Sequence, residues 1–168
     1  MIVSFMGKSP KIAPSAFVSD TAYILGDVEI GEGSSVWPGA IIRGDVAPIK
    51  IGNHVHIQDN CVVHTECGSE IGNDVVIGHA VVVHSRKIGS HVMIGNNATL
   101  LDNCEIGNDT MVGAGSIIPP GAKFADRSMV IGSPAKRKEE ISARHLEQIK
   151  YSLDYYVKWV KIYKEQGF

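Results

Sequence analysis

Residues 88–105 read IGSHVM IGNNAT LLDNCE, which are three consecutive six-residue units that each begin with an aliphatic residue. The residue four places later is small or compact in every unit, as at Val92, Ala98 and Cys104. Gly, Asn and Asp fill the positions between, and these residues tolerate the backbone conformations of tight turns. Each hexad therefore predicts a short strand followed by a corner, and three hexads predict one triangular coil with its aliphatic residues inside.

The same period of six extends over most of the chain. The aliphatic positions are Ile12, Val18, Ile24, Ile30, Val36, Ile42, Ile51, Ile57, Val63, Ile71, Ile77, Val83, Ile88, Ile94, Leu100, Ile106, Val112 and Ile118. They predict about six triangular coils of a parallel β-helix, beginning at residues 12, 30, 51, 71, 88 and 106. Successive coils pair edge to edge at about 4.8 Å. We expect the repeat to stop near Pro119-Pro120-Gly121.

The three cysteines, Cys61, Cys67 and Cys104, all occupy the slot for small residues. Their odd number and the lack of a CxxC spacing argue against a disulfide framework and against a cysteine-built zinc site. We expect all three to be buried packing residues.

The composition changes after Gly132-Ser133-Pro134. Apolar and aromatic residues then recur at intervals of three and four, which predicts an amphipathic helix of roughly 25 to 30 residues along the outside of the coils. We expect one domain, with the hexapeptide-repeat β-helix in residues 1–134 and the C-terminal helix in residues 135–168.

The overall charge and hydropathy exclude several kinds of partner. The chain has 168 residues with 16 basic and 18 acidic side chains, a formal charge of −2, so no basic field favours nucleic acid. No segment approaches the roughly 18 consecutive apolar residues of a membrane span, and no secretory signal opens the chain. We expect a cytoplasmic protein.

Histidines stand out where the repeat otherwise uses small and aliphatic residues. His64 and His84 follow the aliphatic residue of the third hexad in two successive coils, so we expect them to stack and to converge on one metal ion. The third ligand expected is His79, which lies on another side of the triangle and would have to come from a neighbouring subunit. The alternative is a histidine ladder satisfied by hydrogen bonds. The other histidines fit exposed positions: His54, His56, His91 and His145.

Several motifs together are similar to the γ-class carbonic anhydrase family of left-handed, hexapeptide-repeat β-helix proteins. They are Arg43-Gly44-Asp45, Ile57-Gln58-Asp59, Val63-His64-Thr65, the run from Ile77 to His84, and Gly132-Ser133-Pro134-Ala135-Lys136 before the terminal helix. The resemblance covers nearly the whole chain. It implies a mainly β fold, a left-handed parallel β-helix with a C-terminal α-helix packed along it.

The resemblance also implies a metal centre between subunits. His64 and His84 of one subunit and His79 of the next would bind Zn²⁺, with Fe²⁺ or Co²⁺ as alternatives, giving three sites in a homotrimer. Arg43 would pair with Asp45 and Asp59 at the interface.

Two further residues are implied as catalytic. Gln58 would hydrogen-bond the metal-bound water or bicarbonate, and Tyr156 matches a tyrosine near the pocket of many relatives. The reaction implied is reversible hydration of CO2 to bicarbonate by metal-bound hydroxide, because a zinc ion bound by imidazoles lowers the pKa of its water to roughly 7.

One departure from the family affects this activity. Val46 stands where the best-known members carry a glutamate that shuttles protons, so hydration is expected to be weak. Two alternatives stay open: a hexapeptide-repeat acyltransferase or thioesterase acting on a coenzyme A thioester, and a non-catalytic trimeric scaffold that keeps the metal site. The interruptions of the repeat are short and carry no histidine that could serve an acyltransferase.

Overall fold

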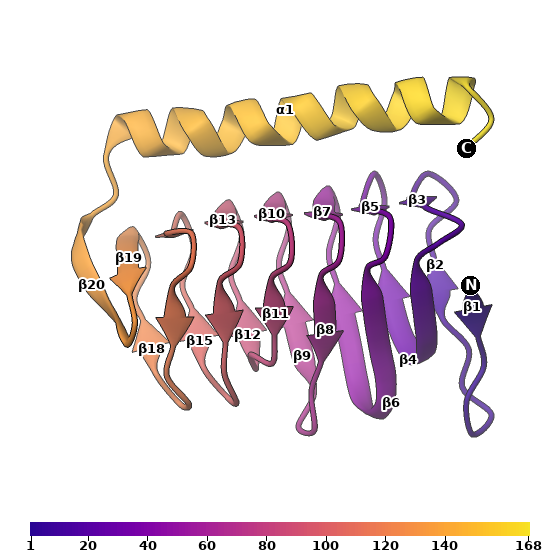
Figure 1. The fold of residues 1–168 in the computed structure, drawn as a ribbon, viewed down its shortest axis with the longest axis horizontal. Helices are drawn as coiled ribbons and strands as arrows, with labels where there is room; N and C mark the ends of the chain where they lie inside the picture. Colours follow the sequence, from indigo (N-terminus) through magenta and orange to yellow (C-terminus); the bar gives the residue numbers. More distant parts are fainter.

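The computed structural model describes residues 1–168 as a left-handed parallel β-helix of about seven turns with one helix along its side (Figure 1). All strand pairs are parallel except the last, between β19 and β20. The prediction of a mainly β coil stack with a C-terminal helix is confirmed.

The strands line three faces of a triangular prism. The first face contains β2 (Lys11–Ile12), β9 (Ser69–Ile71), β12 (Lys87–Ile88), β15 (Glu105–Ile106) and β18 (Lys123–Phe124). The helix face contains β3 (Phe17–Val18), β5 (Ser35–Val36), β7 (Val55–Ile57), β10 (Val75–Ile77), β13 (Val92–Ile94), β16 (Met111–Val112), β19 (Ser128–Gly132) and β20 (Ala135–Glu140). The third face contains β1 (Ile2–Val3), β8 (Val62–His64), β11 (Val82–Val83), β14 (Thr99–Leu100) and β17 (Ile117–Ile118). Two longer strands, β4 (Tyr23–Ile30) and β6 (Ile41–Ile51), bend from the third face onto the first.

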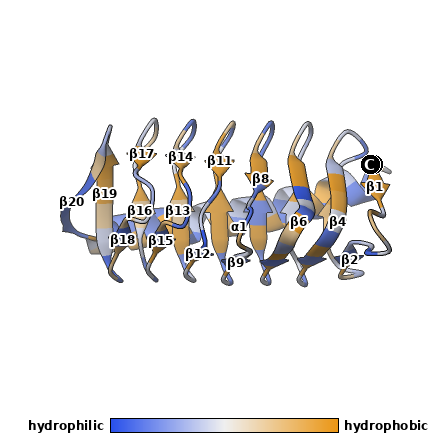
Figure 2. Ribbon diagram, turned by 90° about the horizontal axis from the view of Figure 1, so that it is seen from below, coloured by the Kyte–Doolittle hydropathy of each residue, from blue (hydrophilic) through white to orange (hydrophobic).

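The aliphatic residues of the repeat point inward and form one continuous core. Ile57 pairs in register with Ile77, and Ile77 with Ile94, and all three side chains are fully buried. Figure 2 shows the result as hydrophobic strands separated by hydrophilic corners. The aliphatic residues of successive coils stack on one another and form the close-packed core, as the period of six predicts.

The coil stack is longer than predicted. Phe124 pairs with Ile106 and Val130 with Val112, so a partial seventh turn follows the six predicted coils. Pro119, Pro120 and Gly121 make a corner of the kind found in the other coils and do not end the repeat. The spacing of six continues from Ile118 to Phe124 and Val130.

The terminal helix is shorter than predicted, because the residues before it form a strand. β20 pairs antiparallel with β19, and α1 (Ala143–Glu165) begins after the N-cap residue Ser142, whose hydroxyl accepts a hydrogen bond from the backbone of His145. The helix runs back along the helix face (Figure 1). Its Ile149 packs on Met111 and Met129. The structure contains no helix with the length and apolar content needed to cross a membrane.

The outward side chains of the two uncovered faces differ in character. On the first face a ladder of alternating charge runs from coil to coil: Lys11, Glu29, Lys50, Glu70, Lys87, Glu105 and Lys123. On the third face the outward column is mainly apolar, with Tyr23, Ile41, Val62, Val82, Thr99 and Ile117 in register. We call these the charge ladder and the apolar column.

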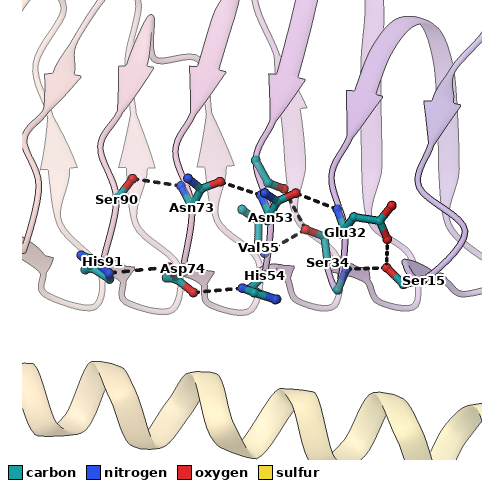
Figure 3. Close-up of polar contacts among 12 residues, drawn as sticks. Ser15, Glu32, Ser34, Asn53, His54, Val55, Asn73, Asp74, Ser90 and His91 are labelled. Carbon is teal, nitrogen blue, oxygen red and sulfur yellow. Dashed lines mark hydrogen bonds and ion pairs between the residues drawn. The ribbon is translucent and has the colours of Figure 1, made fainter.

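Polar side chains connect the coils at their corners (Figure 3). Asn73 Oδ1 accepts a hydrogen bond of 2.8 Å from the backbone N–H of Asn53, and Ser90 Oγ accepts one of 3.0 Å from that of Asn73. At the same corner Asp74 lies between His54 and His91. These contacts satisfy backbone groups that the short strands leave unpaired.

Two sequence-based expectations about burial are wrong. His56 is fully buried, because α1 covers the strand face from which it projects. Cys67 is exposed, whereas Cys61 and Cys104 are buried as expected. The step from Val63 to Ile71 is two residues longer than a hexad, so the segment around Cys67 leaves the coil.

Candidate metal centre

The two stacked histidines meet on the third face. Val63 pairs in register with Val83, and the following residues, His64 and His84, have ring centroids 5.0 Å apart. His64 Nδ1 lies 2.9 Å from His84 Nε2. Arg43 is the register partner of His64 on the preceding coil. The parallel stacking thus brings together a pair that is twenty residues apart in the sequence.

Each ring of the pair has a carboxylate at its other nitrogen. His84 Nδ1 lies 2.6 Å from Asp102 Oδ1, and His64 Nε2 lies 3.2 Å from Asp45 Oδ1. The second contact lacks the alignment of a hydrogen bond, so the buried His64 Nε2 has no hydrogen-bond partner. Because an ionised carboxylate only accepts hydrogen bonds, the Asp102 contact places the ring proton of His84 on Nδ1. The Asp45 carboxylate beside His64 Nε2 favours the ring proton on that nitrogen through charge attraction alone.

This assignment of protons leaves two lone pairs facing each other. When both rings are neutral and His64 carries its proton on Nε2, His64 Nδ1 and His84 Nε2 both act as acceptors at a separation of 2.9 Å. Such a pair repels unless a proton or a cation lies between the two nitrogens. Tetrahedral Zn²⁺ with Zn–N distances of about 2.0 to 2.1 Å needs nitrogens roughly 3.3 to 3.4 Å apart, so a small ring rotation makes room. The donor set therefore fits a metal ion.

The electrostatics keep His64 in the form that binds metals. Burial, followed by the positive charge of Arg43, lowers the pKa of His64 below its ordinary value. A neutral imidazole is the ligand form, and a metal-bound histidine commonly donates its second ring N–H to a carboxylate.

His79 lies away from this pair, on the corner between β10 and β11. Its Nδ1 is 3.0 Å from Asp59 Oδ2, and its side chain is 50% exposed. Within one chain no three metal-binding side chains converge. The contact with Asp59 leaves His79 Nε2 as the nitrogen available to a neighbouring molecule. The structure therefore does not bring His79 to the pair.

The residues predicted around the ligands are only partly brought together. Arg43 Nη1 donates to Asp45 Oδ2 at 2.6 Å, but Asp59 contacts His79 and makes no ion pair with Arg43. Asp45 therefore contacts both Arg43 and His64, whereas Asp59 contacts His79.

The two residues predicted to be catalytic are also separated from the pair within one chain. Gln58 is almost fully buried just after β7. Tyr156 belongs to α1, and its ring stacks on that of His56. Burial, followed by the negative charge of Asp59, raises the pKa of Tyr156 to about 12. Tyr156 is therefore a neutral phenol near neutral pH.

Sequence reasoning missed Asp102. It lies eighteen residues, or one coil, after the histidine that it contacts. The only sequence signal for Asp102 is its spacing of one coil from a candidate ligand. Every residue of the repeat has a neighbour at this spacing, so the signal does not single out Asp102.

The fold and the stacked histidines define a hexapeptide-repeat β-helix protein with a candidate metal centre. Residues 87–120 match the family described as bacterial transferase hexapeptide (six repeats). A carbonic anhydrase of Geobacillus kaustophilus is 40% identical, over 98% of this chain and 91% of the relative. The mitochondrial gamma carbonic anhydrase 2 of Arabidopsis thaliana is 32% identical, over 99% of this chain and 63% of the relative.

A solved structure gives a similar result. A hexapeptide transferase family protein of Anaplasma phagocytophilum superposes with a TM-score of 0.92 at 32% identity, over 96% of this chain and 97% of that chain. The chain belongs to the γ-class carbonic anhydrase-like family of hexapeptide-repeat proteins.

Proposed function

We propose that this chain is a γ-class carbonic anhydrase that reversibly hydrates CO2 to bicarbonate, as a cytoplasmic homotrimer with a metal ion at each subunit interface. The observation that carries the proposal is the pair of His64 and His84, whose facing ring nitrogens lie 2.9 Å apart and which each have a carboxylate beside the second nitrogen. Zn²⁺ is the metal proposed, with Fe²⁺ or Co²⁺ as alternatives, and His79 of a neighbouring subunit is the third ligand.

The surface of the prism supports a trimer. On the third face Ile41, Val82 and Ile117 are each more than a third exposed, which is unusual for stacked aliphatic residues. A second copy that covered this apolar column would remove their surface from water. The pair of His64 and His84 lies on the same face, and His79 lies at its edge. Packing of prisms along this face is therefore the arrangement that would let His79 reach a neighbour's pair.

The metal would act as a Lewis acid that lowers the pKa of a water molecule and so supplies the nucleophile for CO2. The chain's own residues have supporting roles. Asp102 accepts the hydrogen bond of the second ring nitrogen of His84 and keeps that ring in the ligand tautomer, while the charge of Asp45 favours the same tautomer in His64. We assign Gln58 to orienting water or bicarbonate, because its amide can both donate and accept hydrogen bonds. Tyr156, held as a neutral phenol, is assigned a donor role beside it.

The test is to purify the protein without a histidine tag and to measure metal content, mass in solution and CO2 hydration by stopped flow. We expect about one metal per chain, a trimer, and hydration above the buffer rate. His84→Ala should lose both metal and activity. His91→Ala is the matched control, because His91 lies at a corner, in contact with Asp74 and Asp109, and should keep both.

A monomer in solution would overturn the interfacial site, because His79 would then have no pair to complete. Stoichiometric metal without hydration would overturn the reaction and leave the metal centre standing.

A second function is supported by the transferase description of the matched repeats and of the solved relative. In that case the chain would act on a coenzyme A thioester. Hydrolysis of acetyl-coenzyme A by the wild-type protein, lost in His84→Ala, would favour this function over CO2 hydration.

A further inference from the structure

The steps between hexads become irregular at the corner between the third face and the first. The step is nine residues from Ile42 to Ile51, eight from Val63 to Ile71, and only five from Val83 to Ile88. Two protruding corners are therefore followed by a recessed one, and the long connection between β8 and β9 is visible below its neighbours in Figure 1. The result is a hollow of about 570 Å³, which we call the corner hollow.

The lining of the corner hollow is mostly polar, with Pro48 and Cys67 as its less polar residues. The cationic side chains are Lys50, Arg86, Lys87 and Lys123, and the carboxylates are Glu70 and Glu105. A volume within the usual range of ligand pockets, roughly 300 to 1,000 Å³, gives room for a small molecule. Most of the surface that a ligand would cover there is polar.

The charges of the corner hollow are not balanced. Lys123 pairs with Glu105 at 3.0 Å, and at the far end of the charge ladder Lys11 pairs with Glu29 at 3.0 Å. Between these pairs, Lys50, Arg86 and Lys87 form no ion pair.

Glu70 also lacks an ion pair, although it lies in register between Lys50 and Lys87. The unpaired groups therefore leave a surplus of two positive charges around the hollow. The hydrogen bond from Lys123, followed by the charges of nearby cations that include Arg86, lowers the pKa of Glu105 below its ordinary value. This direction is the one expected for a carboxylate in a region of positive charge.

We propose that the corner hollow binds a small phosphate-bearing anion, independently of the metal centre. Arg86 offers a planar set of donors that suits two phosphate oxygens, and the two lysines add point charges on either side. A dianion would neutralise the surplus charge. Phosphate of an inorganic ion and phosphate of a nucleotide share this chemistry, and the hollow has room for more than one phosphate group.

Titration calorimetry with inorganic phosphate, inorganic pyrophosphate and ADP tests the proposal and separates the two sources. Pyrophosphate binding tighter than phosphate, and equal to ADP, would identify the phosphate groups alone as the ligand. Tighter binding of ADP would identify a nucleotide. Affinity should fall as salt is raised, because exposed charges are screened. Absence of binding by all three probes at millimolar concentration would overturn the proposal.

Variants locate the site. Arg86→Gln and Lys87→Gln should each weaken pyrophosphate binding about tenfold, because each removes a charged hydrogen bond to phosphate. Lys11→Gln removes the same charge from the same ladder outside the hollow and should leave binding unchanged. An equal loss in Lys11→Gln would show a diffuse charge effect and no site.

Cys67 gives an independent readout. It lines the hollow and is the one exposed thiol, since Cys61 and Cys104 are buried. Pyrophosphate should slow alkylation of Cys67 by the uncharged reagent iodoacetamide, and half-protection in Lys87→Gln should need about tenfold more pyrophosphate than in the wild type. An unchanged rate at saturating pyrophosphate would place the anion elsewhere. Metal content should be the same in all these variants, so failure here would leave the proposed function untouched.

Discussion

Asp102 Oδ1 lies 2.6 Å from His84 Nδ1, one coil along the β-helix from the histidine that it contacts. This bond fixes the tautomer of His84 and directs its Nε2 lone pair at His64. Asp45 also lies 3.2 Å from His64 Nε2, and Asp59 lies 3.0 Å from His79 Nδ1, as charged contacts. All three candidate ligands therefore have a carboxylate partner, which is the usual outer arrangement of metal-bound histidines.

Asp102→Asn should weaken zinc binding by about 10- to 100-fold, because the amide is a poorer acceptor for the His84 ring proton. Competition with a chromogenic chelator measures the affinity directly, without an activity assay. Asp109→Asn is the control, since Asp109 contacts His91 and is remote from the pair. Unchanged affinity in Asp102→Asn would show that the 2.6 Å contact does not support the ligand.

If the chain forms the proposed trimer, Val82→Lys should give monomers that no longer bind the metal. Val82 lies in the apolar column between Val62 and Thr99, and a covered lysine there would be a charge without a partner, at a cost of about 3 to 5 kcal/mol. Light scattering after gel filtration gives the mass, and metal analysis of the same fractions gives the content. Val157→Lys, on the exposed side of α1, should remain a trimer. A trimer of Val82→Lys that retained its metal would place the interface on another face.

Val46→Glu should raise the hydration rate by about tenfold or more at low buffer concentration. Val46 is 65% exposed, and it follows Asp45, which contacts His64, so a carboxylate there could carry protons to solvent. Stopped-flow hydration over a range of buffer concentrations measures the effect. Wild type and variant should become equal at high buffer, where buffer carries the proton. An equal rate at all concentrations would argue against proton transfer as the limiting step.

The unfolding free energy should fall as the pH drops from about 6.5 to about 4, because of His56. Burial lowers the pKa of His56 from 6.5 to about 4, while its pKa in the unfolded chain stays ordinary. Over this range the unfolded state binds a proton that the folded state does not, so acid favours unfolding. The shift corresponds to roughly 3 kcal/mol when both pKa values have been passed. Urea titrations at several pH values measure it.

His56→Gln removes this titration and should flatten the dependence on pH. His91→Gln, which changes an exposed histidine, should retain it. Equal slopes for wild type and His56→Gln would contradict the assignment to His56.

The prediction of the fold succeeded because the period of six is a local signal repeated many times. Ile57, Ile77 and Ile94 mark the same slot in successive coils, and stacking them in register leaves little freedom in how the coils pair. The stacking of His64 on His84 follows from the same register, so it too could be predicted. The prolines at 119 and 120 predict an end of the repeat that the structure does not have, because Phe124 and Val130 keep its spacing into a seventh turn.

The coil stack, the inward core and the pairing of the two histidines could be predicted, because each depends on the spacing of residues along one chain. Contacts between distant segments and the path of irregular corners appear only in the three-dimensional structure. α1 buries His56 by covering its face, a long corner exposes Cys67, and Asp102 reaches His84 from the next coil. The helix contact and the long corner lie outside the repeat. Asp102 does follow His84 by one coil, but this spacing alone does not tell which residue at that distance makes the contact.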